Sequence, residues 1–211
     1  MSRRVFVAVG LAVGLGVILI GTWGCAARQP VTGQDASDLD RKLSTYAWIE
    51  EGDLVTFIVG TRATRYREDS AYIPLEICIS NNGLKRLILT RESFVLVDEQ
   101  GNRYPAASPR ELMEGYDFLD LDRERLAELS AIIYNKFAAY TQYGSKFSPT
   151  HSTAPFRENL VRDMVSLPRF GYILDFLYFP HPAGQLKGQR LELFLESPDL
   201  PDPVFLKFVV L

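Results

Sequence analysis

Residues 72–80 alternate between apolar and other side chains, and this restricts the segment to an extended strand. Ile73, Leu75, Ile77 and Ile79 occupy alternate positions of YIPLEICIS. Successive side chains of a strand point to opposite faces. One face of this strand is therefore apolar and must be covered by other elements, which indicates a β-rich fold with a buried core.

Similar short runs occur on both sides of this strand, separated mostly by Pro, Gly and Asn. Together they predict seven strands, over residues 54–59, 72–80, 84–90, 93–98, 172–179, 189–196 and 204–211. Asn81-Asn82-Gly83 ends one strand with residues that tolerate positive φ, and Glu99-Gln100-Gly101-Asn102 ends another. The strands thus fall into two groups, separated by a segment of different character.

Helix signals dominate this segment, residues 106–170. Ser108-Pro109-Arg110-Glu111 combines a capping Ser, a Pro suited to the first helical position and a Glu at the third, which predicts a helix start. A second helix is predicted over residues 122–140 because its apolar residues recur at steps of three and four. They are Leu126, Leu129, Ile133, Phe137 and Tyr140. A third, shorter helix is predicted over residues 155–167.

Strands, a helical segment and strands again predict a mainly β fold: an immunoglobulin-like antiparallel β-sandwich over residues 44–211 with a helical insertion at about 106–170. Residues 73–105 resemble the small immunoglobulin-type, telokin-like domain of bacterial lipoproteins. The matching residues are Asn81, Asn82, Gly83, Phe94, Leu96, Asp98, Gly101, Asn102 and Tyr104. These are turn and core residues, so the resemblance implies a fold and no particular activity.

The first 24 residues resemble a bacterial lipoprotein signal peptide that enters the bilayer as a helix. Arg3 and Arg4 precede an uncharged apolar run over residues 5–20, and the small Gly24 precedes Cys25. This order predicts export, cleavage before Cys25 and a lipid on its sulfur. The resemblance also implies an outer-membrane protein facing the periplasm, because Ala26 is not the aspartate that retains lipoproteins at the inner membrane.

Two other interpretations of this N-terminus remain open. The cleavage box matches the usual pattern well only at Gly24, so the apolar run could stay as an inner-membrane anchor with the domain outside the cytoplasm. Alternatively, Cys25 could pair with Cys78, the other cysteine of the chain. Export could use the general or the twin-arginine route. In each case we expect residues 25–43, which are polar and lack apolar periodicity, to act as a flexible tether.

The charge of the chain argues against nucleic-acid binding. Removal of residues 1–24 takes away Arg3 and Arg4 and changes the net charge from −3 to −5. No run of Lys and Arg provides the basic face that phosphate neutralisation requires. No Gly-x-Ser-x-Gly elbow surrounds any serine, so no catalytic residue and no enzyme activity are predicted.

The sequence offers few metal ligands. Four acids lie within eight residues, namely Asp117, Asp120, Asp122 and Glu124. Their spacing is not that of a calcium loop, and acids are typical of a helix start. His151, His181 and Cys78 are too few for a structural zinc site when Cys25 carries lipid. Cys78 fits a small buried side chain better than a nucleophile, and we predict no metal and no cofactor.

An aromatic series follows the second predicted helix: Tyr134, Phe137, Tyr140, Tyr143 and Phe147. These side chains either pack the insertion onto the sandwich or form a partner or ligand surface. The expected function is a lipid-anchored, non-enzymatic structural or protein-interaction module with an envelope protein as partner. The alternative is a lipid- or glycan-binding protein in which the helical insertion is a lid over a pocket.

Overall fold

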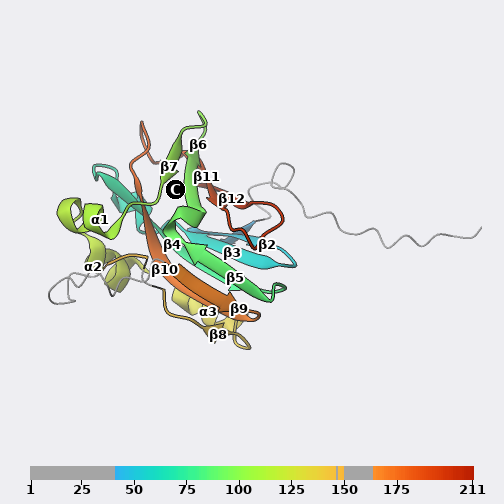
Figure 1. The fold of residues 1–211 in the computed structure, drawn as a ribbon. Helices are drawn as coiled ribbons and strands as arrows, with labels where there is room; N and C mark the ends of the chain where they lie inside the picture. Colours follow the sequence, from blue (N-terminus) through green and yellow to red (C-terminus); the bar gives the residue numbers. More distant parts are fainter. Residues whose placement is uncertain (1–40, 146, 150–163) are drawn as a thin grey trace, which may run out of the picture.

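Three β-sheets enclose one large apolar core in this computed structural model, which describes residues 41–145, 147–149 and 164–211 (Figure 1). The largest is a six-stranded sheet in the order β1-β2-β3-β4-β10-β8. Its strands are β1 (Lys42–Ser44), β2 (Ala47–Glu51), β3 (Val55–Gly60), β4 (Tyr72–Asn81), β10 (Gly171–Pro180) and β8 (Thr141–Gln142). All its pairs are antiparallel except β10 with the short β8.

Two smaller sheets cover the other side of the core. A four-stranded sheet has the order β12-β11-β6-β7, with β12 (Val204–Val209), β11 (Arg190–Leu195), β6 (Phe94–Asp98) and β7 (Arg103–Pro105). A two-stranded ribbon joins β5 (Arg86–Thr90) to β9 (Met164–Pro168). The described chain is therefore a mainly β protein built from several antiparallel sheets.

The seven predicted strands are confirmed, with small differences at their ends. The predicted apolar face of β4 is confirmed. It is fully buried in the main core and consists of Ile73, Leu75, Ile77 and Ile79. The other face of β4 is buried as well, with Cys78 packed in a second cluster beneath a helix. The six-stranded sheet is therefore covered on both faces at this point, unlike a sheet with one wet face.

Short helices lie between β7 and β8: α1 (Pro109–Gly115), α2 (Leu119–Leu121), the π-helix η3 (Asp122–Leu126) and α3 (Leu129–Lys136). Two 3₁₀-helices, η1 (Thr64–Tyr66) and η2 (Arg91–Ser93), lie elsewhere. The helix start at Ser108 is confirmed, because the Ser108 hydroxyl accepts the Glu111 N–H at 3.2 Å and the Glu111 carboxylate accepts the Ser108 N–H at 2.7 Å. No helix in the described part of the chain is long and apolar enough to span a membrane.

The prediction of one continuous helix over residues 122–140 is wrong. The chain forms η3, becomes extended at Ala127 (ψ 130°) and begins α3 at Leu129, which ends at Lys136. Buried polar partners produce this break, because Asp122 is bound at one side and the N-terminus of α3 is bound at the other. Leu129, Ile133 and Phe137 still share one buried face, as their spacing predicted.

Two strands also lie within the span predicted as the helical insertion. Most of the third predicted helix, over 155–167, lies outside the described residues, but residues 164–167 belong to β9 rather than to a helix. Val165 and Leu167 alternate with exposed residues and face the main core, while β9 pairs with β5. Burial on one face and pairing with β5 together favour the strand here.

Candidate functional site

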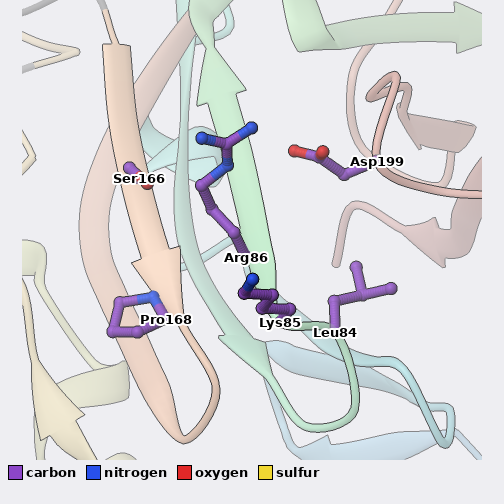
Figure 2. Close-up of a pocket in the computed structure, with 6 residues that line it drawn as sticks. All are labelled: Leu84, Lys85, Arg86, Ser166, Pro168 and Asp199. Atoms are coloured by element: carbon purple, nitrogen blue, oxygen red, sulfur yellow. The ribbon is translucent and has the colours of Figure 1, made fainter.

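A surface hollow of about 540 Å³ lies on the outer face of the β5–β9 ribbon (Figure 2). Its lining residues are Leu84, Lys85, Arg86, Ser166, Pro168 and Asp199. The strand register explains which side chains reach it. Arg86 pairs with Pro168 and both face outward, whereas Leu87 pairs with Leu167 and both are fully buried in the core.

The hollow carries two cations and one carboxylate. Figure 2 shows the Arg86 guanidinium between Ser166 on one side and the Asp199 carboxylate on the other. Asp199 Oδ2 accepts the Ile88 N–H at 2.8 Å, and Ser197 Oγ donates to the Ile88 carbonyl at 2.9 Å. Asp199 thus covers the free edge of β5, which would otherwise be open to strand pairing. Arg86 makes no ion pair in the described part of the chain.

The turn before β5 contains the Asn-rich segment that the sequence predicted as a turn, and its side chains hold the turn in place. The Asn81 side chain accepts the Leu84 N–H at 2.9 Å and donates to the Leu167 carbonyl at 2.9 Å, so it ties the turn to β9. At Gly83 a Cβ would lie 2.7 Å from the carbonyl oxygen of Asp53. Glycine is therefore required here by a close backbone approach.

A second turn, after β9, completes this end of the ribbon. Phe170 has a positive φ of 62° and donates its N–H to the Asn81 carbonyl at 2.7 Å. Arg169 Nε donates to the Asn82 carbonyl at 3.1 Å, and its guanidinium lies 4.9 Å from the Phe170 ring centre. Phe170 remains 46% exposed. We call Lys85, Arg86, Arg169 and Phe170 the ribbon end.

A second surface feature is the outer face of the four-stranded sheet. Cross-strand register places Val95 beside Phe194 and Phe194 beside Phe205. The two phenylalanine rings stack with their centres 5.1 Å apart, and Lys207 Nζ lies 5.9 Å from the Phe205 ring centre. All of these side chains are half-buried, as is Val97. We call Val95, Val97, Phe194 and Phe205 the aromatic sheet face.

The five aromatic residues predicted as a partner or ligand surface occupy different environments. Phe137 is buried beneath α3, whereas Phe147 is buried in the main core. Tyr134 is 79% exposed on α3. Tyr140 and Tyr143 are half-buried, and the Tyr140 ring packs 5.4 Å from that of Phe170 at the ribbon end. The structure therefore brings Phe137 and Tyr140 together, with ring centres 5.1 Å apart, but does not gather all five rings on one surface.

The four acids within residues 117–124 also lie in different environments. Asp122 is fully buried, and its carboxylate accepts the Tyr116 hydroxyl at 2.5 Å and contacts the Arg67 guanidinium. Burial raises the pKa of Asp122, although the bonds from Tyr116 and Arg67 oppose that shift. The other three acids are exposed or half-buried. Within the described ranges, no group of three or more His, Cys, Asp and Glu residues lies close enough to hold a metal ion.

Glu76 is a buried carboxylate that the sequence analysis did not single out. It lies in β4 with 3% exposure, and its Oε2 accepts the N–H groups of Glu128 at 2.6 Å and Leu129 at 3.0 Å. Burial raises the pKa of Glu76 to about 7, against the effect of these two hydrogen bonds. Its side chain caps α3 and satisfies amides that a helix start leaves free. A glutamate within an apolar strand was the available signal.

Asp175, in β10, is a second carboxylate that the sequence analysis missed. One oxygen accepts the Phe147 N–H and the Ser145 hydroxyl, both at 2.9 Å, and the other accepts from Arg123 Nη2 at 2.8 Å. Burial raises the pKa of Asp175, while Arg123 acts to lower it. Asp175 therefore holds the segment after β8 against the edge of β10.

The cysteines and histidines form no joint site in the described part of the chain. Cys78 is a free, fully buried thiol, and burial raises its pKa well above the usual value, so it is a poor nucleophile. His181 is half-buried, with Nδ1 2.6 Å from the Pro182 carbonyl oxygen. Cys25 and His151 lie outside the described residues.

Comparisons with known proteins give little further guidance. No protein-family model matches the chain, and no curated protein matches it significantly. Among solved structures, the chain is similar to a proposed lipoprotein (ycdA) from Bacillus subtilis, with a TM-score of 0.39 and 13% identity. The similarity covers 76% of this chain and 38% of that chain. A TM-score this low does not identify a shared fold.

Proposed function

We propose that this protein is a lipid-anchored component of the cell envelope that acts as a non-enzymatic interaction module. Arg3, Arg4 and the apolar run after them supply the export signal, and Cys25 is the lipid attachment point. We place the protein at the outer membrane, facing the periplasm, with an uncleaved inner-membrane anchor as the alternative. The domain that it displays is an immunoglobulin-like sandwich, a proposal supported by the antiparallel sheets that pack on both sides of one apolar core.

The aromatic sheet face is the observation that carries this proposal. Water-facing sides of antiparallel sheets usually present polar side chains, whereas this one places two stacked phenylalanines and two valines side by side. Ion pairs flank them, from Lys207 to Glu192 at 2.9 Å and from Arg103 to Glu196 at 3.0 Å. An aromatic centre with a charged rim is typical of protein interfaces. We therefore propose that an envelope protein binds here.

The roles of the buried carboxylates support a non-enzymatic function. Glu76 caps a helix, Asp122 binds Arg67, and Asp175 fixes a segment to a strand edge. Each of these groups stabilises the fold through bonds inside the protein. The arrangement is that of structural networks rather than of an acid and base facing a substrate.

The alternative of a lidded pocket receives less support. Leu129 and Ile133 of α3, together with Phe137 directly after it, are at most 5% exposed. They pack in one cluster with Ile58 and Cys78 of the six-stranded sheet. A lid over a ligand pocket would need to separate from this sheet. The close apolar contact favours a fixed attachment of α3 instead.

Photo-crosslinking in intact cells tests the partner surface. A benzoylphenylalanine at position 205 keeps an aromatic ring on the sheet face, and the same residue at position 134 serves as a control because Tyr134 is exposed elsewhere. We expect one discrete protein adduct from position 205 and none from position 134. The same adducts from both positions, or none from position 205, would refute the proposed interface.

The anchor has its own test. In cells fed a labelled fatty acid, the wild-type chain should incorporate label and sediment with membranes. Cys25→Ser should abolish the label, because the thiol is the attachment atom. An unlabelled wild-type chain that still sediments with membranes would instead support the uncleaved anchor.

A further inference from the structure

The ribbon end lies at one end of the six-stranded sheet. β2 ends at Glu51, which pairs with Thr56 near the start of β3, and Val55 of β3 pairs with Asn81 at the end of β4. The turn before Arg86 follows directly from β4, and the turn after Pro168 leads directly into β10. Figure 1 shows these strand ends on the same side of the molecule.

The described chain enters the domain at this same end. The Arg41 carbonyl accepts the Ile49 N–H at 2.8 Å, and the Arg41 guanidinium contacts the Glu50 carboxylate. Because β1 runs antiparallel to β2, the chain before Lys42 leads past Glu50 toward the end of β2. The point at which the described chain begins therefore lies at the same end of the sheet as the ribbon end, so an anchor attached through the preceding residues is compatible with contact between the ribbon end and the membrane.

The charge of this end differs from that of the chain. Lys85, Arg86 and Arg169 are exposed, and the described structure gives none of them an ion pair, although the whole chain has a net charge of −3. Of the acids nearby, Glu50 and Glu51 already contact cations. Asp53 and Asp199 remain negatively charged, and Asp199 accepts the Ile88 N–H at the β5 edge, so the three cations exceed these two acids by one charge. The ribbon end is therefore cationic, with one exposed aromatic ring.

We propose that the ribbon end binds the anionic phospholipid surface of the membrane that carries the anchor, an inference that rests on the lipid anchor proposed above. Each Lys or Arg near an anionic bilayer raises partitioning about five-fold. An exposed aromatic such as Phe170 is suited to the headgroup level. The ribbon end would then face the membrane. Lys187 lies at the opposite end of the domain, next to Leu186, whose N–H donates to the Glu68 carboxylate.

Fluorescence quenching by brominated lipids tests this contact in the anchored, full mature protein. A Phe170→Trp substitution places the reporter, and Trp48 contributes little because it is only 2% exposed. The vesicles contain phosphatidylcholine with or without phosphatidylglycerol. We expect strong quenching only in the anionic vesicles. Adding Lys85→Gln and Arg169→Gln should lower the contact equilibrium about twenty-five-fold, because two charges are removed. Lys187→Gln is the matched control and should change nothing.

Flotation of the same vesicles separates the two proposals. A protein that floats with the vesicles but shows no quenching would overturn the ribbon-end contact and leave the anchor intact. Equal effects of Lys187→Gln and Lys85→Gln would also overturn it, because net charge alone would then explain the binding. A protein that does not float would overturn the anchor and, with it, the contact. Unchanged urea midpoints of the Gln variants confirm that they are folded.

Discussion

Single buried acids decide several local structures in this protein, and Glu76 is the clearest case. Its carboxylate lies at the N-terminus of α3, where two free amides and the positive end of the helix favour a negative charge. Burial opposes that charge more strongly, and the pKa rises to about 7. Glu76 is thus partly protonated near neutral pH, and it gives the protein a pH-dependent helix cap.

The pKa of Glu76 predicts a specific dependence of stability on pH. A raised pKa means that the folded protein binds the proton more tightly than the unfolded chain. The contribution of Glu76 to the free energy of unfolding is then full below pH 4.5 and falls as the pH rises through 7, by up to about 3 kcal/mol. Glu76→Gln keeps an acceptor oxygen without the charge, so its urea midpoint should decline less between pH 5 and pH 8.

Glu124→Gln is the control for this experiment, because Glu124 is exposed. It should follow the wild-type pH profile. If Glu76→Gln also follows that profile, Glu76 does not titrate in this range.

At the scale of elements, hydrogen bonds from side chains attach the irregular segments to the sheets. Asp175 binds Ser145, Phe147 and Ser148 at the edge of β10, and Asp199 covers the edge of β5. Asn81 joins the turn before β5 to β9. Strand edges that would otherwise remain open are thereby closed.

Loss of Asp175 should release the segment after β8. Asp175→Ala removes acceptors for the Phe147 N–H and leaves the Arg123 guanidinium without its carboxylate, so we expect a loss of about 3 kcal/mol in the free energy of unfolding. Urea denaturation followed by circular dichroism measures this. Glu114→Ala breaks an exposed pair with Arg110 and should cost no more than about 0.5 kcal/mol. Equal losses in the two variants would contradict the assigned role.

The Asn-rich turn provides a steric test. In Gly83→Ala the new Cβ would lie 2.7 Å from the Asp53 carbonyl oxygen, so the turn must shift at a cost of about 2 kcal/mol. Gly144→Ala is the control, because a Cβ there has no neighbour within 4 Å. Similar urea midpoints for the two variants would mean that the turn adapts freely.

At the scale of the whole molecule, α3 and the six-stranded sheet enclose Cys78. The thiol is fully buried among Ile58, Leu129 and Ile133. A bridge to Cys25 would require α3 to separate from the sheet. This packing favours Cys25 as an attachment point over the alternative of a disulfide.

A reducing agent should therefore leave the stability of the protein unchanged. We expect identical urea midpoints for the purified mature chain with and without dithiothreitol, and a mass that includes the lipid on Cys25. A lower midpoint in dithiothreitol, together with a mass that lacks lipid, would indicate the Cys25–Cys78 disulfide.

Alternation and capping signals in the sequence determined much of the fold. Ile73, Leu75, Ile77 and Ile79 predicted β4, and Ser108 with Glu111 predicted the start of α1. Both signals depend only on neighbours along the chain, which is why they can be identified without a structure. The helix over 122–140 had equally good periodicity, but its continuity depended on residues far away in sequence.

Contacts between distant residues were decided only by the tertiary structure. Glu76 of β4 caps the start of α3, and Arg67 forms an ion pair with Asp122. Residues 164–168 form a strand because they pair with β5. The ribbon end likewise joins two turns that are more than eighty residues apart in sequence. Such contacts depend on which elements share a core and on the burial of charge. The sequence by itself thus determined the seven predicted strands and the expected export signal. The fold determined the remaining strands, β9 among them, and where the cations, the aromatic face and the buried acids meet.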